Sequence, residues 1–326
     1  MGLIAYSCPY VPAEIIAAYG LTPSRILPSS GSFSGPVGVT AGVCPYMRGF
    51  INSACASSEV DAIILTTVCD QMRRAKDYLD QRTDIPSFML NVPSTWQTAE
   101  ALRLYVSEIR RLGHFLERMG GQPPEVDAMW RIMESYDRKR GKLRSLKGVL
   151  PAIEYSLAIA KFNKSGRIAD TGVNVPFTGK GIPLALIGGP MTMMDFQLVE
   201  MVREYGGDIV LDGTESGERT MPARFNFRHS IHDDPIEELA ECYFGYIPGV
   251  FRRPNSELYR WLMRELDSLK ILGVILIRHT WCDKWHAEVC RLKEWLKVPL
   301  LDIEIDGESL IVRNSCRIQA FIEALS

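Results

Sequence analysis

Short apolar runs alternate along the chain with longer segments in which apolar residues recur every three or four positions. The short runs have the length and the β-branched content of buried strands, and the longer segments have the period of amphipathic helices. This alternation is typical of α/β proteins with parallel sheets. The runs that we expect to form strands are residues 62–68, 87–92, 182–187, 208–212, 271–277 and 300–305.

The helical segments have recognisable boundaries. The first, residues 13–19, stops at Gly20, a common residue after a helix C-terminus. The clearest helical period covers residues 98–119. A helical middle section is expected to extend to about residue 160, followed by a polar, glycine-bearing loop over 163–181. The other expected helices are residues 70–81, 194–205 and 317–325.

The chain divides into two α/β parts in this pattern. Residues 120–124, with two glycines and two prolines, interrupt it and indicate a boundary. We therefore expect two Rossmann-like or flavodoxin-like domains with parallel sheets, joined by a helical connecting section. The expected ranges are 1–120 for the N-terminal domain, 121–181 for the helical section and loop, and 182–326 for the C-terminal domain.

The two α/β parts share a short pattern. In the first, a buried run leads to Cys69 and a helix, and Pro86 opens the next run 17 residues later. In the second, a buried run leads to Cys282 and a helix, and Pro299 follows after 17 residues. Ligands bind beyond the carboxyl ends of strands in open α/β sheets, where both cysteines are expected. The pattern favours two similar halves that face each other, with a chance match as the alternative.

The composition is that of a globular protein, with 46% apolar and 23% charged residues and a net charge of −2. Lys and Arg are spread along the chain, so no block favours nucleic acid or a membrane surface. No apolar run reaches the roughly 18–20 residues of a membrane span. The first residues lack the charged and apolar regions of a signal peptide. These features predict a cytoplasmic protein.

The eight cysteines are the first chemical signal. A reducing compartment disfavours disulfides, which leaves core thiols, catalytic thiols or metal ligands. None occurs in a CxxC pair, so distant parts of the chain would have to supply any metal ligands. A helix N-terminus favours a thiolate. Five cysteines lie near expected helix starts: Cys8, Cys44, Cys69, Cys282 and Cys316.

The other three cysteines favour a structural role. Cys55 and Cys290 lie inside helical segments, and Cys242 is ambiguous but leans toward packing. Thiolates alone do not distinguish iron from zinc. Three or five cysteines without paired histidines nearby fit an iron–sulfur cluster better than a closed four-ligand zinc site.

Several short motifs occur in a fixed order along nearly the whole chain. They are the opening segment Tyr10–Gly20, Cys44-Pro45-Tyr46, Val68-Cys69-Asp70 with Arg73, the loop 213–219, Trp281-Cys282-Asp283 and the ending 317–323. This ordered set resembles the 2-hydroxyacyl-CoA dehydratase family. The family includes the D-component of 2-hydroxyglutaryl-CoA dehydratase and subunits of ATP-dependent benzoyl-CoA reductase.

The resemblance implies a [4Fe–4S] cluster held by Cys44, Cys69 and Cys282. It also implies an ATP-hydrolysing iron–sulfur activator that supplies low-potential electrons, a homodimer or a heterodimer with a family member, and an acyl-CoA or small-molecule substrate. Glu14, the acid of the opening motif, is a candidate catalytic proton donor. The alternative for Glu14 is a helix N-terminal acid stabilised by the helix dipole.

Additional cysteines leave a second arrangement open. Cys8 and Cys316 resemble those of the double-cubane branch of the family, in which six cysteines hold an [8Fe–9S] cluster that reduces small molecules. Cys242 is the first candidate for the sixth ligand, and Cys55 and Cys290 are the weaker alternatives. His279 and His286 flank Cys282 and could tune a cluster through hydrogen bonds, or could be ordinary surface residues. A non-catalytic electron-transfer subunit and a cluster-free binding protein are the other functional alternatives.

Overall fold

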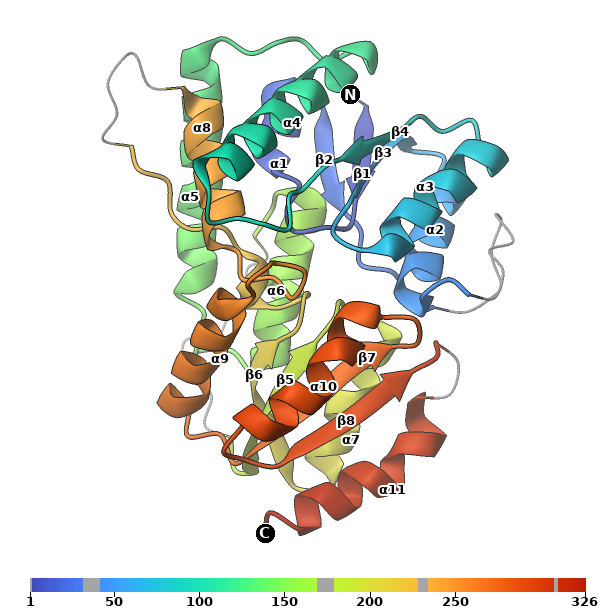
Figure 1. The fold of residues 1–326 in the computed structure, drawn as a ribbon, viewed down its shortest axis with the longest axis vertical. Helices are drawn as coiled ribbons and strands as arrows, with labels where there is room; N and C mark the ends of the chain where they lie inside the picture. The colour runs from blue at the N-terminus through green and yellow to red at the C-terminus, as the bar shows by residue number, and fades with distance from the viewer. Residues whose placement is uncertain (1, 32–41, 169–178, 228–233, 308–309) are drawn as a thin grey trace.

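The computed structural model describes residues 2–31, 42–168, 179–227, 234–307 and 310–326. It contains two four-stranded sheets in which every pairing is parallel (Figure 1). The first sheet is formed by β1 (Leu3–Tyr6), β2 (Thr22–Arg25), β3 (Val60–Thr66) and β4 (Ser87–Leu90). The second is formed by β5 (Ile182–Gly188), β6 (Gly207–Gly213), β7 (Gly273–His279) and β8 (Leu300–Ile305). The expectation of two Rossmann-like or flavodoxin-like α/β domains is confirmed.

The two sheets have the same strand order. The first runs β2-β1-β3-β4 and the second runs β6-β5-β7-β8, so each has the order second, first, third, fourth. In such a sheet the connections leave the first and third strands in opposite directions, which opens a crevice at their carboxyl ends. The repeated order gives each half one crevice. It agrees with the two similar halves that the sequence pattern favours.

Helices surround both sheets. Their bounds in the first half and the middle section are α1 (Ala13–Ala18), α2 (Pro45–Ala56), α3 (Asp70–Arg82), α4 (Ala99–Arg118), α5 (Val126–Arg144) and α6 (Ala152–Ser165). In the second half they are α7 (Gln197–Glu204) with the preceding 3₁₀ turn η1 (Met194–Phe196), η2 (Glu218–Thr220), α8 (Pro235–Ala240), η3 (Glu241–Gly245), α9 (Ser256–Ser268), α10 (Asp283–Trp295) and α11 (Leu310–Glu323). Helix α6 contacts both β2 and β6 and connects the halves (Figure 1).

One segment of the second half packs into the first. Helix α8 contacts α4 and α5, and the π-helical turn η3 contacts α4. Phe225, Phe244 and Phe251 are buried in the same hydrophobic cluster as β1 and β3. The sequence pattern gave no indication of this return. The domain boundaries at residues 120 and 181 stay predictions.

Most expected elements agree with the structure within a few residues, and the main differences concern two strands, the last helix and the loop 163–181. Strands β1 and β2 were not expected, because each has only four residues and β2 contains Pro23. The last helix begins at Leu310 rather than at residue 317. Of the expected loop 163–181, residues 163–165 belong to α6, and residues 169–178 lie outside the described part of the chain.

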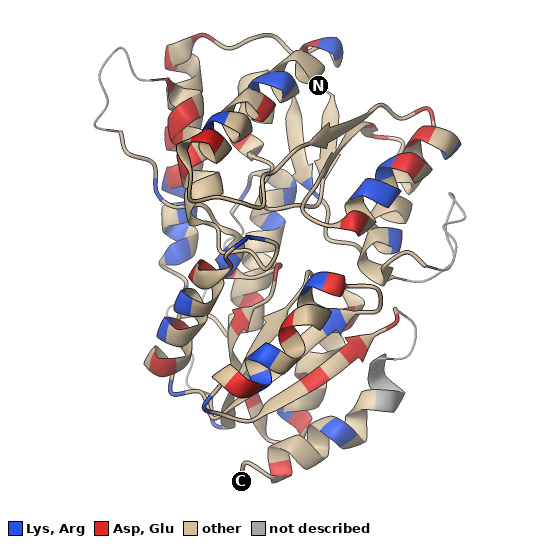
Figure 2. Ribbon diagram, viewed as in Figure 1, with Lys and Arg blue, Asp and Glu red and all other residues tan. Residues whose placement is uncertain are grey.

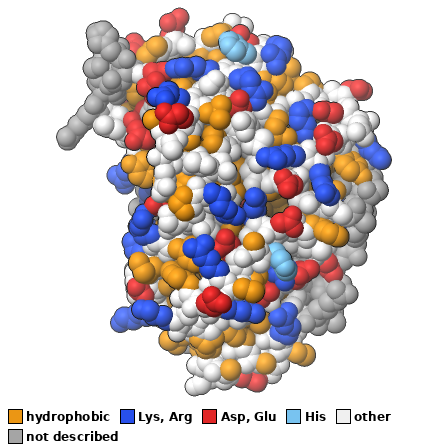
Figure 3. All heavy atoms as spheres, viewed as in Figure 1, with side chains coloured by type: hydrophobic (Ala, Val, Ile, Leu, Met, Phe, Trp, Pro, Cys, Tyr) orange, Lys and Arg blue, Asp and Glu red, His pale blue; other side chains and the backbone are white. Residues whose placement is uncertain are grey.

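Charged residues of both signs are distributed over the helices of both halves (Figure 2). On the face seen in Figure 3 they are interspersed with apolar side chains. This mixture agrees with the net charge of −2. Within the described ranges, every helix is too short or too polar to cross a membrane.

Candidate functional site

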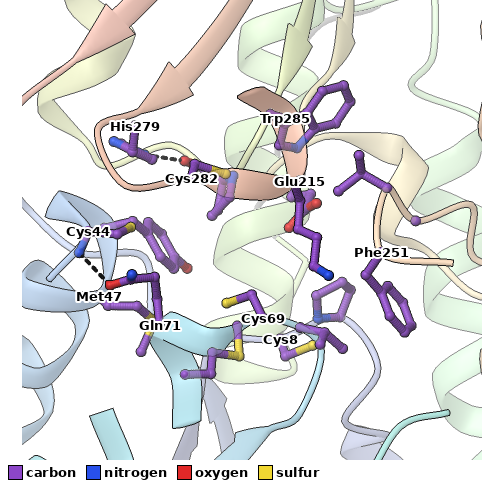
Figure 4. Close-up of a pocket in the computed structure, with 18 of the residues that line it drawn as sticks. Cys8, Cys44, Met47, Cys69, Gln71, Glu215, Phe251, His279, Cys282 and Trp285 are labelled. Atoms are coloured by element: carbon purple, nitrogen blue, oxygen red, sulfur yellow. Dashed lines mark hydrogen bonds between the residues drawn. The ribbon is translucent and has the colours of Figure 1, made fainter. Parts of the chain in front are cut away.

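A pocket of about 110 Å³ lies between the two halves, where the carboxyl ends of strands from both sheets meet. Its walls include the residues that directly follow β1, β3 and β7, and therefore join the crevices of both sheets. Its lining includes Cys8, Tyr10, Cys44, Tyr46, Met47, Cys69, Gln71, Glu215, Arg219, Phe251, His279, Cys282 and Trp285, most of which are labelled in Figure 4.

Three cysteines of this pocket occupy the same structural position. Cys44 is the N-cap residue of α2, Cys69 of α3 and Cys282 of α10. Each sulfur therefore lies beside free backbone N–H groups and the positive end of a helix dipole, both of which favour a thiolate or an anionic cluster. The structure brings these three predicted ligands, from both halves of the chain, to one pocket.

The three thiols influence one another. Burial raises the pKa of Cys69 and of Cys282 to about 12, and burial raises the pKa of Cys44 further. The neighbouring thiols Cys282 and Cys69 add to the rise at Cys44. The backbone N–H of the third helical residue acts in the opposite direction at each sulfur. Without a metal the three groups are thus neutral thiols near pH 7.

An amide side chain connects two of these helix ends. Gln71, in the first turn of α3, accepts a hydrogen bond from the backbone N–H of Cys44 at 2.8 Å. The N-termini of α2 and α3 are thereby held together, and with them Cys44 and Cys69.

Cys8 belongs to the same pocket, although it caps no helix. It follows β1, has 1% of its surface exposed, and precedes α1, whose N-cap is Pro12. Burial raises the pKa of Cys8 to about 11. Four of the eight cysteines therefore line one pocket.

The other four cysteines lie elsewhere. Cys316 was expected before the last helix, but it lies within α11, is exposed and does not line the pocket. Its position gives no support to the ligand role predicted for it. Cys242 is buried in η3 and donates weakly to the carbonyl of Arg224 at 3.5 Å. Cys55 is partly buried on α2, and Cys290 is exposed on α10.

Glu14 lies away from the pocket, in a buried polar group. Its carboxylate forms an ion pair with Arg140 of α5 and accepts a hydrogen bond from the Tyr243 hydroxyl at 2.7 Å. Arg140 also donates to Tyr243 at 2.7 Å. Glu14 is fully buried and does not line the pocket. Its surroundings favour a structural role over the predicted proton donor.

The two histidines that flank Cys282 differ. His279 is buried at the pocket wall, and its Nε2 donates to the Pro190 carbonyl at 2.7 Å. His286 is exposed on α10. Only His279 has the placement that a hydrogen bond to a pocket ligand requires.

No role was assigned in the sequence analysis to two charged residues that the loop after β6 contributes to the pocket, Glu215 and Arg219. Arg219 donates to the carbonyls of Gly213 at 2.9 Å, Pro248 at 2.6 Å and Gly188 at 3.1 Å. Glu215 lies 3.7 Å from Arg219 and raises the pKa of Cys8, Cys69 and Cys282. Both lie in the loop 213–219, which the sequence indicated as part of the family resemblance without assigning a role to either.

Comparison with known proteins identifies the family. The family model described as 2-hydroxyglutaryl-CoA dehydratase, D-component, matches residues 8–325. The chain belongs to this family. No curated protein matches the chain.

The similar solved structures share little sequence identity with this chain. They include the SBP FpvC from Pseudomonas aeruginosa in complex with Mn²⁺, at 12% identity over all of this chain and 98% of that one, with a TM-score of 0.27. An Mn-bound periplasmic metal binding protein from Candidatus Liberibacter asiaticus has 10% identity over the full length of both chains and a TM-score of 0.25. Likeness at this level carries no argument about the site.

The cysteines of the pocket are potential metal ligands. Across the described residues, no three His, Cys, Asp or Glu side chains are grouped closely enough to hold one metal ion. A cluster attaches each thiolate to a different iron, so its ligands lie farther apart than those around one ion. Three helix-capping thiols that line one pocket are donors of the type that an iron–sulfur cluster takes.

Proposed function

We propose that the chain holds a [4Fe–4S] cluster in this pocket through Cys44, Cys69 and Cys282, as the iron–sulfur component of a dehydratase or reductase. The observation that carries the proposal is the meeting of three helix-capping cysteines from both halves at one pocket. Because burial keeps these thiols protonated near pH 7, iron binding would release their protons. The helix N-termini would then stabilise the thiolates.

A bound cluster would supply one-electron chemistry and an iron that can take an oxygen ligand. The chain's own residues set the conditions around it. Tyr10, Phe251 and Trp285 form largely buried aromatic walls that limit the access of water. Arg219 holds three backbone segments of the pocket in place through its carbonyl contacts. An apolar, rigid surrounding of this kind is what tunes the potential of a metal centre.

Family membership supports a proposal about the partners. We propose that a separate ATP-hydrolysing iron–sulfur activator supplies the electrons, in the cytoplasm, to a homodimer or a heterodimer with a family member. The proposed substrate is an acyl-CoA or another small molecule. Conversion of an acyl-CoA with the activator as sole protein partner would support an enzyme. Reduction of this chain without conversion would instead favour the electron-transfer subunit.

Iron and acid-labile sulfide counts on anaerobically reconstituted protein test the cluster. We expect about four irons per chain in the wild type and a loss of most iron and sulfide in Cys69→Ala. Cys290→Ala is the matched control, because Cys290 is an exposed cysteine outside the pocket and should leave the counts unchanged. A colourless wild-type protein without iron or sulfide would overturn the proposal.

The structure favours one cubane over the double-cubane alternative. A six-thiol cluster needs two cysteines beyond the four that line the pocket. The remaining cysteines, Cys55, Cys242, Cys290 and Cys316, lie outside it. A count of about eight irons per chain that falls in Cys316→Ala would reverse this preference.

A further inference from the structure

The pocket contains an acidic side chain that faces the cysteines. Glu215 follows β6 and lies across the pocket from Cys44, near Cys282 and Cys69 (Figure 4). The side chain is 22% exposed, so the carboxylate is at the pocket rather than on the open surface. Asp70 and Asp283 also line the pocket, but both are exposed, whereas Glu215 is partly buried; Glu14 lies outside the pocket.

The backbone of Glu215 is fixed from both sides. Its N–H donates to the carbonyl of Gly189 at 3.2 Å, and its carbonyl accepts from Arg25 Nη2 at 2.8 Å. Arg25 also donates to the carbonyl of Ser7 at 2.8 Å, one residue before Cys8. The position of Glu215 is therefore set by contacts to both halves of the chain.

The charges at this place are unfavourable in the absence of a cation. Glu215 lines the same pocket as Cys8, Cys69 and Cys282, so its carboxylate and any thiolates there repel one another. Among the described residues its ion-pair partner is Arg219, at 3.7 Å. Arg219 is committed to three backbone carbonyls. A metal centre would turn this repulsion between negative groups into attraction, because bound metal ions dominate the local charge.

We propose that Glu215 supplies the oxygen ligand to the iron that Cys44, Cys69 and Cys282 do not hold. A cubane with three thiolate ligands leaves one iron without a protein donor, and carboxylates are established ligands of non-haem iron. In Figure 4, Glu215 lies across the pocket from Cys44, on a side to which Cys44 contributes no donor. This inference rests on the proposed function and adds the fourth ligand to it.

Cys8 is the competing fourth donor, since it also lines the pocket. The two candidates differ in what they give the iron. Glu215 gives an oxygen ligand and one iron site unlike the other three, whereas Cys8 gives four sulfur-ligated sites. ⁵⁷Fe Mössbauer spectroscopy separates these cases in the wild-type protein.

The test uses reconstituted wild type, Glu215→Gln, Glu215→Cys and Cys8→Ala. We expect one distinct iron site in the wild type, its conversion to a sulfur-ligated site in Glu215→Cys, and no change in Cys8→Ala. In Glu215→Gln the iron and sulfide counts should persist. Its midpoint potential should rise by about 59 mV or more, a tenfold change in a one-electron equilibrium, because an anionic ligand is lost.

Glu218→Gln is the matched control. Glu218 lies in the same loop but pairs with Lys147 at 2.6 Å and does not line the pocket, so the spectrum and potential should match the wild type. Unchanged spectra and potentials in both Glu215 variants would overturn the inference. Four equivalent iron sites in the wild type, one of which changes in Cys8→Ala, would also overturn it. A wild type without iron would instead contradict the proposed function itself.

Discussion

The buried pair of Glu14 and Arg140 offers the sharpest test of the structure, because it decides between a structural and a catalytic Glu14. Both side chains are at most 4% exposed, and the Tyr243 hydroxyl bonds to each. Glu14→Gln keeps the shape and removes the negative charge. The guanidinium of Arg140 is then buried without a counter-charge.

Glu14→Gln is expected to lower the free energy of unfolding by a large amount. Removal of one partner of a buried ion pair costs about 3–5 kcal/mol. Two unit charges about 4 Å apart at an effective dielectric constant of 20 interact by about 4 kcal/mol, which gives the same range. Native proteins have only about 5–15 kcal/mol of stability, so the change should be obvious in urea unfolding followed by tryptophan fluorescence.

Two further variants make the test specific. Glu14→Gln combined with Arg140→Met removes both charges and should recover most of the lost free energy of unfolding. Arg110→Gln removes a largely exposed pair with Asp234 and should cost about 1 kcal/mol or less. If Glu14→Gln left the stability unchanged but abolished substrate conversion with the cluster intact, the structural assignment of Glu14 would be refuted.

Three other predictions concern the pocket and its supports. Gly188 has a φ of +140°, and a Cβ there would lie 1.9 Å from a backbone carbonyl oxygen of β7. Gly188→Ala should therefore lower the free energy of unfolding by about 2–6 kcal/mol. Gly141→Ala, in the open interior of α5, should raise it by about 0.5–1 kcal/mol, and equal effects in the two variants would contradict the backbone placement. In the iron-free protein, the raised pKa of Cys69, about 12, should make its alkylation at pH 8 roughly a thousandfold slower than that of an ordinary thiol of pKa about 8.5. The alkylation rate of Cys69 should increase about tenfold per pH unit up to that pKa. Mass spectrometry can compare the labelling of Cys69 with that of the exposed Cys290, and equal labelling of the two at pH 8 would contradict the prediction. Arg219→Met should cost at least about 3 kcal/mol because it leaves three carbonyls without their charged donor, and a wild-type urea midpoint would rule out that role.

The positions of Cys44, Cys69 and Cys282 at helix starts could be predicted from the sequence, whereas their surroundings could not. Cys69 and Cys282 each follow a clear apolar run and precede a clear helix, so their place at strand ends could be inferred locally. Pro45 after Cys44 is a typical first helical residue and marks the same position. These signals lie within a few residues of each cysteine, which is why they could be recognised without a structure.

The features that were missed depend on contacts between distant residues. Arg219 reaches carbonyls up to 31 residues away, and no local pattern announces such contacts. The return of α8 and η3 to the N-terminal core likewise depends on tertiary packing. For Cys316 the start of the helix was placed too late. Because the helix extends back to Leu310, this cysteine lies in its middle rather than at its N-terminus.

Two arginines hold together segments of the pocket that are distant in the sequence, and one of them, Arg25, connects the two halves. Arg25 joins a carbonyl before Cys8 to the carbonyl of Glu215, and Arg219 joins the last residues of β5 and β6 to Pro248. A guanidinium presents several donors in a fixed plane, so each arginine fixes the mutual orientation of the segments it joins. Thiols on three helices can share one cluster only if those helices keep their relative positions. The two arginines therefore hold segments of the pocket in place in the metal-free chain, and the proposed cluster would bind to segments that are already ordered.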